Sequence, residues 1–556
     1  MNLSSQVFPS DLPRDDVNLE AKTRSVTSVR AKNKLGTTLS IAAIAGLSGL
    51  IFFARLHTYG EPLERDLTTY AVIGHEMLGG KTLYTDLWDH KPPAIYVTYA
   101  AAELIAGYGR NAIFLLNISA GFATLLACYF AGSAAGGGRL GGLVAATLWA
   151  LASGDLAIEG NQPNTEVFLN ALLTSGFAIL MRVENRNLGL RAALLIGLSF
   201  AVASLYKNIA VVEAALLALA YFAWPAADSR KKALVNVVII AVIGALAWGL
   251  VFTYFAAQGQ GKAFTEAVFT YNAYYSGSIW QNLGHTVTWP RVSADVLVAL
   301  FPLAILSLAG TVLGLIFGPR RPWIFLLTFA IATHIAVLLP GRFFPHYYQL
   351  WLPPLAIGGG WSVSFLKRIL PAAFSRLVYI VAGTTCGILL MLELSYYSLP
   401  AEIWSVKKYG RIFLETERVA RQIDHLLPPT ATFYEWGDES GFYFTSGHRP
   451  SSGVFLAEPT LAGPLAEKLS RRLIDDLERA KPTLIVIDSL TLAQTARGHP
   501  VLHWLEENYR PFSRTDKFSV PIGCAPHLIL AQDQFVLLCR KGSSWTARTE
   551  PAELMD

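Results

Sequence analysis

Long apolar segments separated by short polar ones make up most of the first 400 residues of this 556-residue chain. About 20 apolar residues are needed for a helix to cross a bilayer. The first such segment, about 35–56, is too long for a signal-peptide core and lacks a small-residue cleavage pattern, so it predicts an uncleaved span. Ten further spans are predicted near 111–131, 139–153, 165–182, 190–206, 208–224, 234–256, 293–317, 322–339, 346–364 and 376–398.

The polar segments predict how these spans are oriented. Residues 1–35 are polar and basic, which predicts a disordered cytoplasmic tail. The apolar segment 93–107 is predicted as a helix that is re-entrant or lies at the interface, because a further full crossing would invert every later loop. With eleven spans, the cytoplasmic side after residue 130 carries twelve basic residues: Arg139, Arg182, Arg186, Arg191, Arg230, Lys231, Lys232, Arg320, Arg321, Lys367, Arg368 and Arg376.

The opposite side carries four basic residues, namely Lys207, Lys262, Arg291 and Arg342. Twelve against four is the excess of positive charge expected on the cytoplasmic side of a membrane. The N-terminus is therefore predicted inside, and the first loop, 57–110, and the C-terminus outside.

From about residue 400 the composition becomes that of a soluble domain. Residues 431–437, 482–488 and 534–539 resemble buried strands, and 467–480 has the apolar spacing of a helix. The chain is thus predicted to contain a transmembrane domain, 36–399, followed by a small exterior α/β domain, 400–556.

Composition narrows the class of protein further. The chain is 53% hydrophobic and 15% charged, with a mean hydropathy of +0.40, which is typical of a helical membrane protein. A net charge of +5 does not indicate a nucleic-acid partner. The four cysteines have no metal-ligand spacing, and Cys524 and Cys539 are compatible with either a disulfide or two free thiols.

The richest chemistry lies between Glu64 and Tyr96, where eight charged side chains and two histidines follow the first apolar segment. Asp66 is expected near the membrane surface, where its carboxylate could accept a proton from a hydroxyl group. It also precedes an amphipathic segment, so an N-cap is an equally good interpretation. The sequence leaves both open.

Lys91 precedes two prolines, which exclude αR geometry at the lysine and begin a new helix. This arrangement predicts a cation at the mouth of an interfacial helix, where a lipid phosphate would lie. The alternative is an ordinary lysine that extends its charge to the interface. Lys207 lies between two spans, where a buried cation needs an anionic partner.

Other predicted outer loops add polar groups that a shared site would require. They carry Asn164 and Glu166, the aromatic and amide-bearing segment around Asn272, and Arg342 with His346 and Tyr347. For each aromatic side chain alone, the interfacial aromatic belt is the simpler interpretation.

The first loop resembles that of the GT-C type, lipid-dependent membrane glycosyltransferases, specifically the polyprenyl- or dolichyl-phosphate mannosyltransferases of family 39 and the aminoarabinose transferases. The resemblance covers roughly residues 36–400. Its residues in the first loop are Asp66 to Ala71, Glu76, Met77, Gly80, Tyr84 to Asp86 and Lys91 to Tyr96. Later segments similar to the family are Asn164 to Glu166, Lys207 and Arg342 to Pro354.

The resemblance implies a membrane enzyme that transfers a sugar from a polyprenyl-phosphate donor to a lipid, glycan or protein acceptor at the exterior leaflet. It assigns Asp66 as general base. The donor phosphate would be bound by Lys91, Lys207 and Arg342. Substrate contacts would come from Tyr70, Tyr84, Asp86, Tyr96, Asn164, Glu166, Asn272, His346 and Tyr347.

The family has an Asp-Glu pair where this chain has Asp66 and Leu67. The missing second acid leaves open any contact that it makes to a divalent cation or to the sugar. Glu64 is expected to point elsewhere on a helix. Since no second carboxylate is evident, one-step displacement with inversion at the anomeric carbon is predicted.

Two other classes of function stay in consideration. A transporter or flippase of lipid-linked sugars would explain the spans, but not the acid-rich loop or the exterior domain. A non-catalytic envelope assembly protein would use the exterior domain to bind a partner, and Asp66 would then be dispensable.

Overall fold

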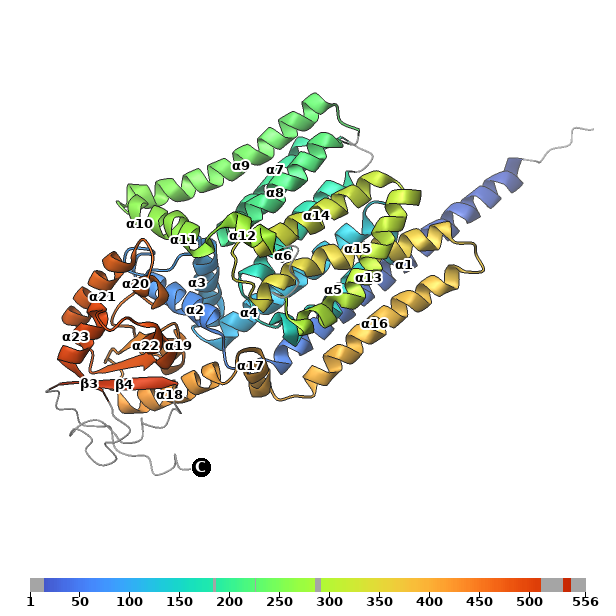
Figure 1. Cartoon of the computed structure of the whole chain (residues 1–556). Helices are drawn as coiled ribbons and strands as arrows, with labels where there is room; N and C mark the ends of the chain where they lie inside the picture. The colour runs from blue at the N-terminus through green and yellow to red at the C-terminus, as the bar shows by residue number, and fades with distance from the viewer. Residues whose placement is uncertain (1–14, 184–186, 226, 286–291, 512–533, 542–556) are drawn as a thin grey trace, which may run out of the picture.

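The computed structural model describes residues 15–183, 187–225, 227–285, 292–511 and 534–541. A bundle of long helices carries a smaller C-terminal region at one end, and the described start of the chain lies at the opposite end (Figure 1). The bundle consists of α1 (Asp15–His57), α4 (Arg110–Ser133), α5 (Gly138–Ala152), α6 (Thr165–Arg182), α7 (Leu190–Tyr206), α8 (Ala210–Ala223), α9 (Arg230–Ala257), α13 (Ala294–Phe317), α14 (Arg320–Leu338), α15 (Leu352–Ile369) and α16 (Ser375–Tyr397).

Among the described residues, six helices are long and apolar enough to cross a membrane, and four shorter apolar helices accompany them. Their outer surface is apolar as well: Leu246 and Leu250 on α9 are 60% and 71% exposed. Exposure of so large an apolar surface to water is unfavourable, whereas in a membrane the lipid tails cover it. The protein is a polytopic helical membrane protein, as the sequence predicts, and the count of eleven spans stays a prediction.

Two expectations about the helices were wrong. The helix α1 begins at Asp15, so residues 15–34 of the expected disordered tail are helical, whereas residues 1–14 lie outside the described residues; residues 15–34 contain no Gly or Pro to interrupt the helix. The span expected at 346–364 begins only at Leu352, since Pro345–Trp351 forms a separate 3-10 helix, η4. Prolines in the first turn of α15 favour a helix start there.

Shorter helices connect the bundle to the C-terminal region. They are α2 (Arg65–Leu78), α3 (Ala94–Ala106), η1 (Leu156–Ile158), α10 (Gly261–Thr265), the π-helix η2 (Glu266–Tyr271), α11 (Asn272–Ser276) and α12 (Ile279–Gly284). The helices α2 and α3 touch at the backbone: a methyl group added at Gly74 would lie 2.9 Å from the backbone N of Ala100.

The C-terminal region is α/β, as predicted. Its sheet has the order β1-β2-β4-β3, with β1 and β2 parallel and the other pairs antiparallel. The strands are β1 (Tyr434–Trp436), β2 (Leu484–Asp488), β3 (Tyr509–Pro511) and β4 (Phe535–Arg540). The helices are α17 (Ala401–Tyr409), α18 (Ile412–Leu426), α19 (Gly441–Ser446), α20 (Glu458–Leu461), α21 (Ala466–Ala480), α22 (Ser489–Gln494) and α23 (Pro500–Asn508).

Candidate active site

A cavity of about 530 Å³ lies where the first loop, the ends of the bundle helices and the C-terminal region meet. We call it the central cavity. A volume of this size is typical of small-molecule sites. Its ionisable lining residues are Glu64, Arg65, Asp66, His90, Lys91, Glu159, Lys207, Tyr275, His346, Tyr347, Tyr409, Asp438 and Glu458.

Asp66 reaches the cavity from the first turn of α2, and it is not the N-cap of that helix. Glu64 is the N-cap, and its carboxylate accepts a hydrogen bond from the backbone N of Asp66 at 3.0 Å. The N-cap interpretation of Asp66 is therefore wrong, and its own carboxylate is left for other contacts.

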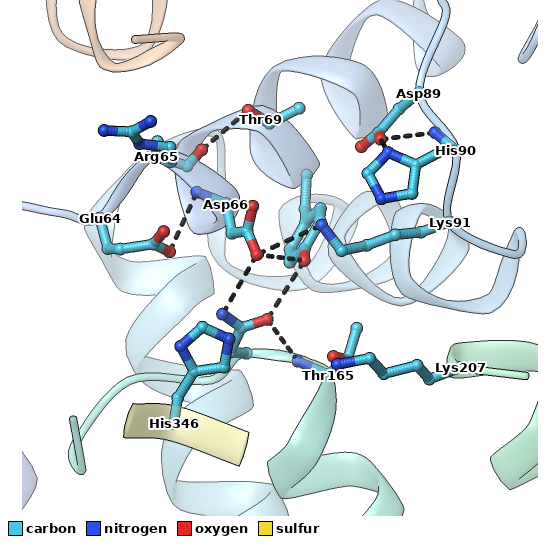
Figure 2. Close-up of polar contacts among 12 residues, drawn as sticks. Glu64, Arg65, Asp66, Thr69, Asp89, His90, Lys91, Thr165, Lys207 and His346 are labelled. Atoms are coloured by element: carbon cyan, nitrogen blue, oxygen red, sulfur yellow. Dashed lines mark hydrogen bonds and ion pairs between the residues drawn. The ribbon is translucent and has the colours of Figure 1, made fainter. Parts of the chain in front are cut away.

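One carboxylate oxygen of Asp66, Oδ2, collects three partners (Figure 2). The Nζ of Lys91 lies at 3.2 Å, the Tyr70 hydroxyl at 3.1 Å and the Asn164 amide at 3.4 Å. Burial alone would raise the pKa of Asp66, but the charges of Lys91 and His346 and the hydrogen bonds from Lys91 and Asn164 hold that pKa well below its usual range. Asp66 is thus an ionised carboxylate at any physiological pH.

Lys91 is held on the cavity wall by the loop that precedes α3. The Tyr84 hydroxyl donates to the backbone O of Lys91 at 2.8 Å, and the Lys91 ammonium lies 4.9 Å from the ring centre of Tyr70. Burial would lower the pKa of Lys91, but Asp66 and Asp89 raise it above its usual value. The side chain stays charged, with one ammonium hydrogen directed at Asp66 and two donors left for a ligand.

Lys207 has the anionic partner that its position between two spans requires. Its ammonium lies 2.5 Å from Oε1 of the fully buried Glu166 and 3.6 Å from the ring centre of Tyr347. Lys207 and Tyr347 line the cavity, whereas Glu166 stands behind the lysine and holds it. A second ammonium group therefore faces the same space as Lys91.

His346 lines the cavity from η4. Its Nδ1 lies 2.7 Å from Oε2 of Glu159, which belongs to the loop after η1. The sequence predicted a substrate contact for His346, but did not identify Glu159 as the residue that orients it. Asn272 also lines the cavity, and its amide donates to the backbone O of His90 at 2.6 Å.

Seven predicted site residues do not line the central cavity, and three of them, Tyr70, Asn164 and Glu166, instead bond to the side chains of Asp66 and Lys207. Arg342 lies outside the cavity, with a nitrogen 3.0 Å from Glu458 and its guanidinium 3.8 Å from the Tyr275 ring centre. The other three are Tyr84, Asp86 and Tyr96.

These three residues shape the first loop instead. The fully buried Tyr96 packs its ring edge-on against Tyr70, with the ring centres 5.9 Å apart. The Asp86 carboxylate accepts from the backbone N of Thr82 at 2.8 Å, which fixes a turn. Tyr84 positions Lys91, as described above. These contacts give Tyr84, Asp86 and Tyr96 a structural role in the first loop, and their contact with substrate stays a prediction.

The sequence missed two groups of cavity residues. Glu64 was expected to point elsewhere, yet it lines the cavity beside Asp66. Burial and the neighbouring charge of Asp66 raise the pKa of Glu64 to about 8. The second group comes from the C-terminal region: Tyr409, Ile412, Phe413, Asp438, Leu456 and Glu458. No local sequence pattern could place these residues next to Asp66.

The C-terminal region is fastened to the first loop by side-chain contacts around the cavity. Arg65 pairs with Glu439 at 2.8 Å and lies 3.6 Å from Asp438. Lys408 and Glu61 form a buried ion pair at 2.9 Å. The wall that this region contributes is therefore a fixed part of the cavity.

In the part of the chain that the structure describes, no group of three His, Cys, Asp or Glu side chains is arranged to hold a metal ion. The free cysteines described are Cys128 and Cys386. Cys524 lies outside the described residues, and the side chain of Cys539 is not described, so their pairing stays an open alternative.

No protein-family model matches the sequence, and no curated protein is significantly similar to it. Solved structures are similar in fold. ArnT from Cupriavidus metallidurans bound to undecaprenyl phosphate superposes with a TM-score of 0.58 at 15% identity, over 91% of this chain and 99% of ArnT. The archaeal oligosaccharyltransferase AglB from Archaeoglobus fulgidus, in complex with an inhibitory peptide and a dolichol-phosphate, gives 0.51 at 13% identity, over 86% of this chain and 74% of AglB.

This chain has the GT-C fold. The apo state of the Cupriavidus ArnT gives a similar TM-score of 0.56 at 16% identity, over 90% of this chain and 98% of that one. The alignment with ArnT includes the C-terminal region as well as the bundle, because it spans nearly all of both chains. At such low identity the comparison establishes the GT-C fold, and the chemistry must be argued from the site of this chain.

Proposed function

We propose that this protein is a membrane glycosyltransferase that transfers a sugar from a polyprenyl-phosphate donor to a lipid, glycan or protein acceptor. The observation that carries the proposal is the contact between the Asp66 carboxylate and the Lys91 ammonium, 3.2 Å apart on the wall of a cavity at the end of the bundle. A carboxylate beside an ammonium group is the arrangement that a base and a phosphate-binding cation would require. Two proteins of the same fold hold undecaprenyl phosphate and dolichol-phosphate.

The phosphate would be bound by lysine ammonium groups. The ammonium groups of Lys91 and Lys207 each contact one carboxylate, and their other N–H donors can bind phosphate oxygens. They stabilise the negative charge that grows on the leaving group when the bond to the sugar breaks. Arg342 would have to leave Glu458 to take part, so we assign the phosphate to the two lysines first.

In the transfer step, a hydroxyl oxygen of the acceptor forms a bond to the anomeric carbon of the sugar. The bond from that carbon to the phosphate oxygen breaks, and polyprenyl phosphate leaves with the electron pair. The proton of the hydroxyl passes to the carboxylate of Asp66. Tyr70 and Asn164 hold that carboxylate in place.

Donor binding would also strengthen the base. In the free protein, Lys91 keeps the pKa of Asp66 low, which makes the carboxylate a weak base. A phosphate anion bound to Lys91 offsets that positive charge, so the pKa of Asp66 rises towards the range useful for proton transfer. The base becomes effective when a donor is present.

Glu64 is the second carboxylate that the sequence did not reveal, and it bears on the stereochemistry. Its raised pKa, about 8, keeps it mostly protonated at neutral pH. A protonated carboxyl group is a poor nucleophile, so a covalent glycosyl-enzyme intermediate on Glu64 is disfavoured. We therefore retain one-step displacement with inversion.

The test is a transfer assay with the full chain in lipid nanodiscs and a panel of undecaprenyl-phosphate sugars. Release of undecaprenyl phosphate that depends on an added acceptor, and that Asp66→Asn abolishes, is the expected result. Movement of an intact lipid-linked sugar across a vesicle membrane, without cleavage, would instead establish a flippase. Failure of every donor to bind would contradict the proposal.

A further inference from the structure

The walls of the central cavity differ in chemistry. The bundle and first loop contribute all the basic side chains of the lining, Arg65, His90, Lys91, Lys207 and His346, together with the acidic side chains of Glu64, Asp66 and Glu159. The wall from the C-terminal region consists of Tyr409, Ile412, Phe413, Asp438, Leu456 and Glu458. Among these described lining residues there is no Lys, Arg or His, and the two acidic side chains are those of Asp438 and Glu458.

The two carboxylates of this wall are accessible. The side chain of Asp438 is 29% exposed and that of Glu458 is 50% exposed. One oxygen of Asp438 accepts from the backbone N of Ala457 at 3.0 Å, and the other lies 3.6 Å from Arg65. Glu458 uses Oε1 for Arg342, at 3.0 Å. Each carboxylate therefore keeps capacity to accept further hydrogen bonds.

The guanidinium groups near this wall are already engaged by protein carboxylates. Arg65 lies 2.8 Å from Glu439, and Arg342 is held between Glu458 and the ring of Tyr275. An anionic group placed against the wall would meet Asp438 and Glu458 first, and would have to displace them to reach an arginine. Neutral hydroxyl groups placed there could donate hydrogen bonds to the carboxyl oxygens of Asp438 and Glu458.

An exposed aromatic ring completes the surface. Phe344 lines the same cavity and is 44% exposed. Pyranose rings present hydroxyl groups around their edge and C–H groups on their faces, so they are bound by carboxylates at the edge and by an aromatic face. Asp438, Glu458 and Phe344 supply both kinds of contact.

We propose that the wall formed by Asp438 and Glu458 is the acceptor subsite, and that it takes a hydroxyl group of an uncharged glycan rather than a phosphorylated acceptor. This inference rests on the proposed function, because it assigns the acceptor side of that same cavity. The carboxylates accept hydrogen bonds from sugar hydroxyls and direct one hydroxyl towards Asp66. The donor phosphate stays on the lysine side.

The first experiment measures transfer by the full chain in nanodiscs from the undecaprenyl-phosphate sugar that it uses. The acceptors are a panel of methyl glycosides and the 6-phosphates of the same glycosides. We expect the uncharged glycosides to be preferred. Glu458→Gln and Asp438→Asn should raise the KM for the acceptor roughly 3- to 10-fold, because each removes one charged hydrogen-bond acceptor, with the KM for the donor unchanged.

The matched control is Glu467→Gln, which removes a carboxylate from the surface of α21, where the side chain is 79% exposed. This variant should change neither the KM for the acceptor nor the KM for the donor. Preference for a phosphorylated acceptor, or an unchanged acceptor KM in both cavity variants, would overturn the inference while leaving the donor chemistry intact.

A second readout separates this inference from the proposed function. Saturation-transfer NMR on the detergent-solubilised full chain reports binding of the same glycosides without any donor. Signals that weaken in the Asp438→Asn, Glu458→Gln double variant but not in Glu467→Gln support the subsite even if no tested donor reacts. Equal signals in all three proteins would contradict it.

Discussion

At the scale of single residues, the pair formed by Asp66 and Lys91 is the centre of the proposed chemistry. The sequence could bring the two residue types into one loop, because they lie 25 positions apart on either side of α2. It could not decide whether Asp66 caps the helix, since that depends on the residue at which the helix begins. A start at Arg65 gives the cap to Glu64 and frees Asp66.

The substitution Asp66→Asn tests the assignment of the base. It preserves size and leaves the Glu64 cap in place, but an amide cannot take the proton. Turnover should fall roughly 10²- to 10⁴-fold, while binding of undecaprenyl phosphate persists. Asp86→Asn is the matched control, because that aspartate closes a turn in the same loop. Near-normal turnover in a folded Asp66→Asn protein would exclude Asp66 as the base.

Lys91→Ala tests the phosphate contact. Loss of a charge-assisted hydrogen bond costs about 1.5–3 kcal/mol, so the Kd for undecaprenyl phosphate should rise roughly 10- to 150-fold. Lys91→Arg should restore only part of the affinity, because a planar fork does not replace a compact ammonium. Lys262→Ala, whose side chain is 85% exposed on α10, should bind normally. Unchanged affinity in Lys91→Ala would remove this lysine from the phosphate site.

The raised pKa of Glu64 leads us to expect that donor binding depends on pH. Below pH 8 it is mostly protonated and neutral, and above about 8 it becomes a second negative charge beside Asp66. The added charge repels a phosphate by about 1 kcal/mol, which is roughly fivefold in donor KM. Glu64→Gln keeps the cap acceptor and stays neutral, so its donor KM should not rise across that range. A parallel rise in both proteins would assign the effect to another group.

At the scale of elements, α2 and α3 set the distance between the side chains of Asp66 and Lys91. Asp66 lies in the first turn of α2, and Lys91 lies just before α3. Hydrophobic spacing predicted both helices, because each buries an apolar face. Their close approach at Gly74 was not predictable, since it depends on which turn of α3 faces that glycine.

Gly74→Ala should therefore damage activity more than folding. The added methyl group would lie 2.9 Å from the backbone N and 3.4 Å from the Cα of Ala100, and a backbone cannot rotate away as a side chain does. The two helices must separate, at a cost of about 1–3 kcal/mol. We expect at least a tenfold loss of turnover in a protein that still purifies as a monodisperse species. Gly46→Ala on α1, where a methyl group meets nothing within 4 Å, is the control.

At the scale of the whole molecule, most of the fold was predicted from the apolar segments of the sequence. Nine of the eleven expected spans correspond to one bundle helix within a few residues, and the first corresponds to the apolar part of α1, Leu35–His57, because burial in lipid imposes a length and a composition that can be read locally. The expected span at 346–364 was shifted by η4. The contribution of the C-terminal region to the cavity was out of reach, because it joins Asp66 to residues about 370 positions away.

The charge asymmetry of the loops predicts the orientation of the bundle, which cysteine labelling tests. In a variant without native cysteines, Thr85→Cys and Ser489→Cys should react with an impermeant thiol reagent in intact cells, whereas Ser229→Cys should react only after lysis. Labelling of Ser229→Cys with protection of Thr85→Cys would reverse the predicted topology.

The strand order of the C-terminal sheet has a consequence for the order in which the protein folds. The strand β4 lies between β2 and β3, although it is the last of the four along the chain. Its Phe535 packs edge-on against Phe442 of α19, and the Ser440 hydroxyl beside that helix bonds to Thr69 of α2. A ribosome therefore releases the bundle helices, with both Asp66 and Lys91, before it releases the strand that completes the C-terminal sheet. We therefore expect the helix bundle to insert into the membrane before the C-terminal sheet forms.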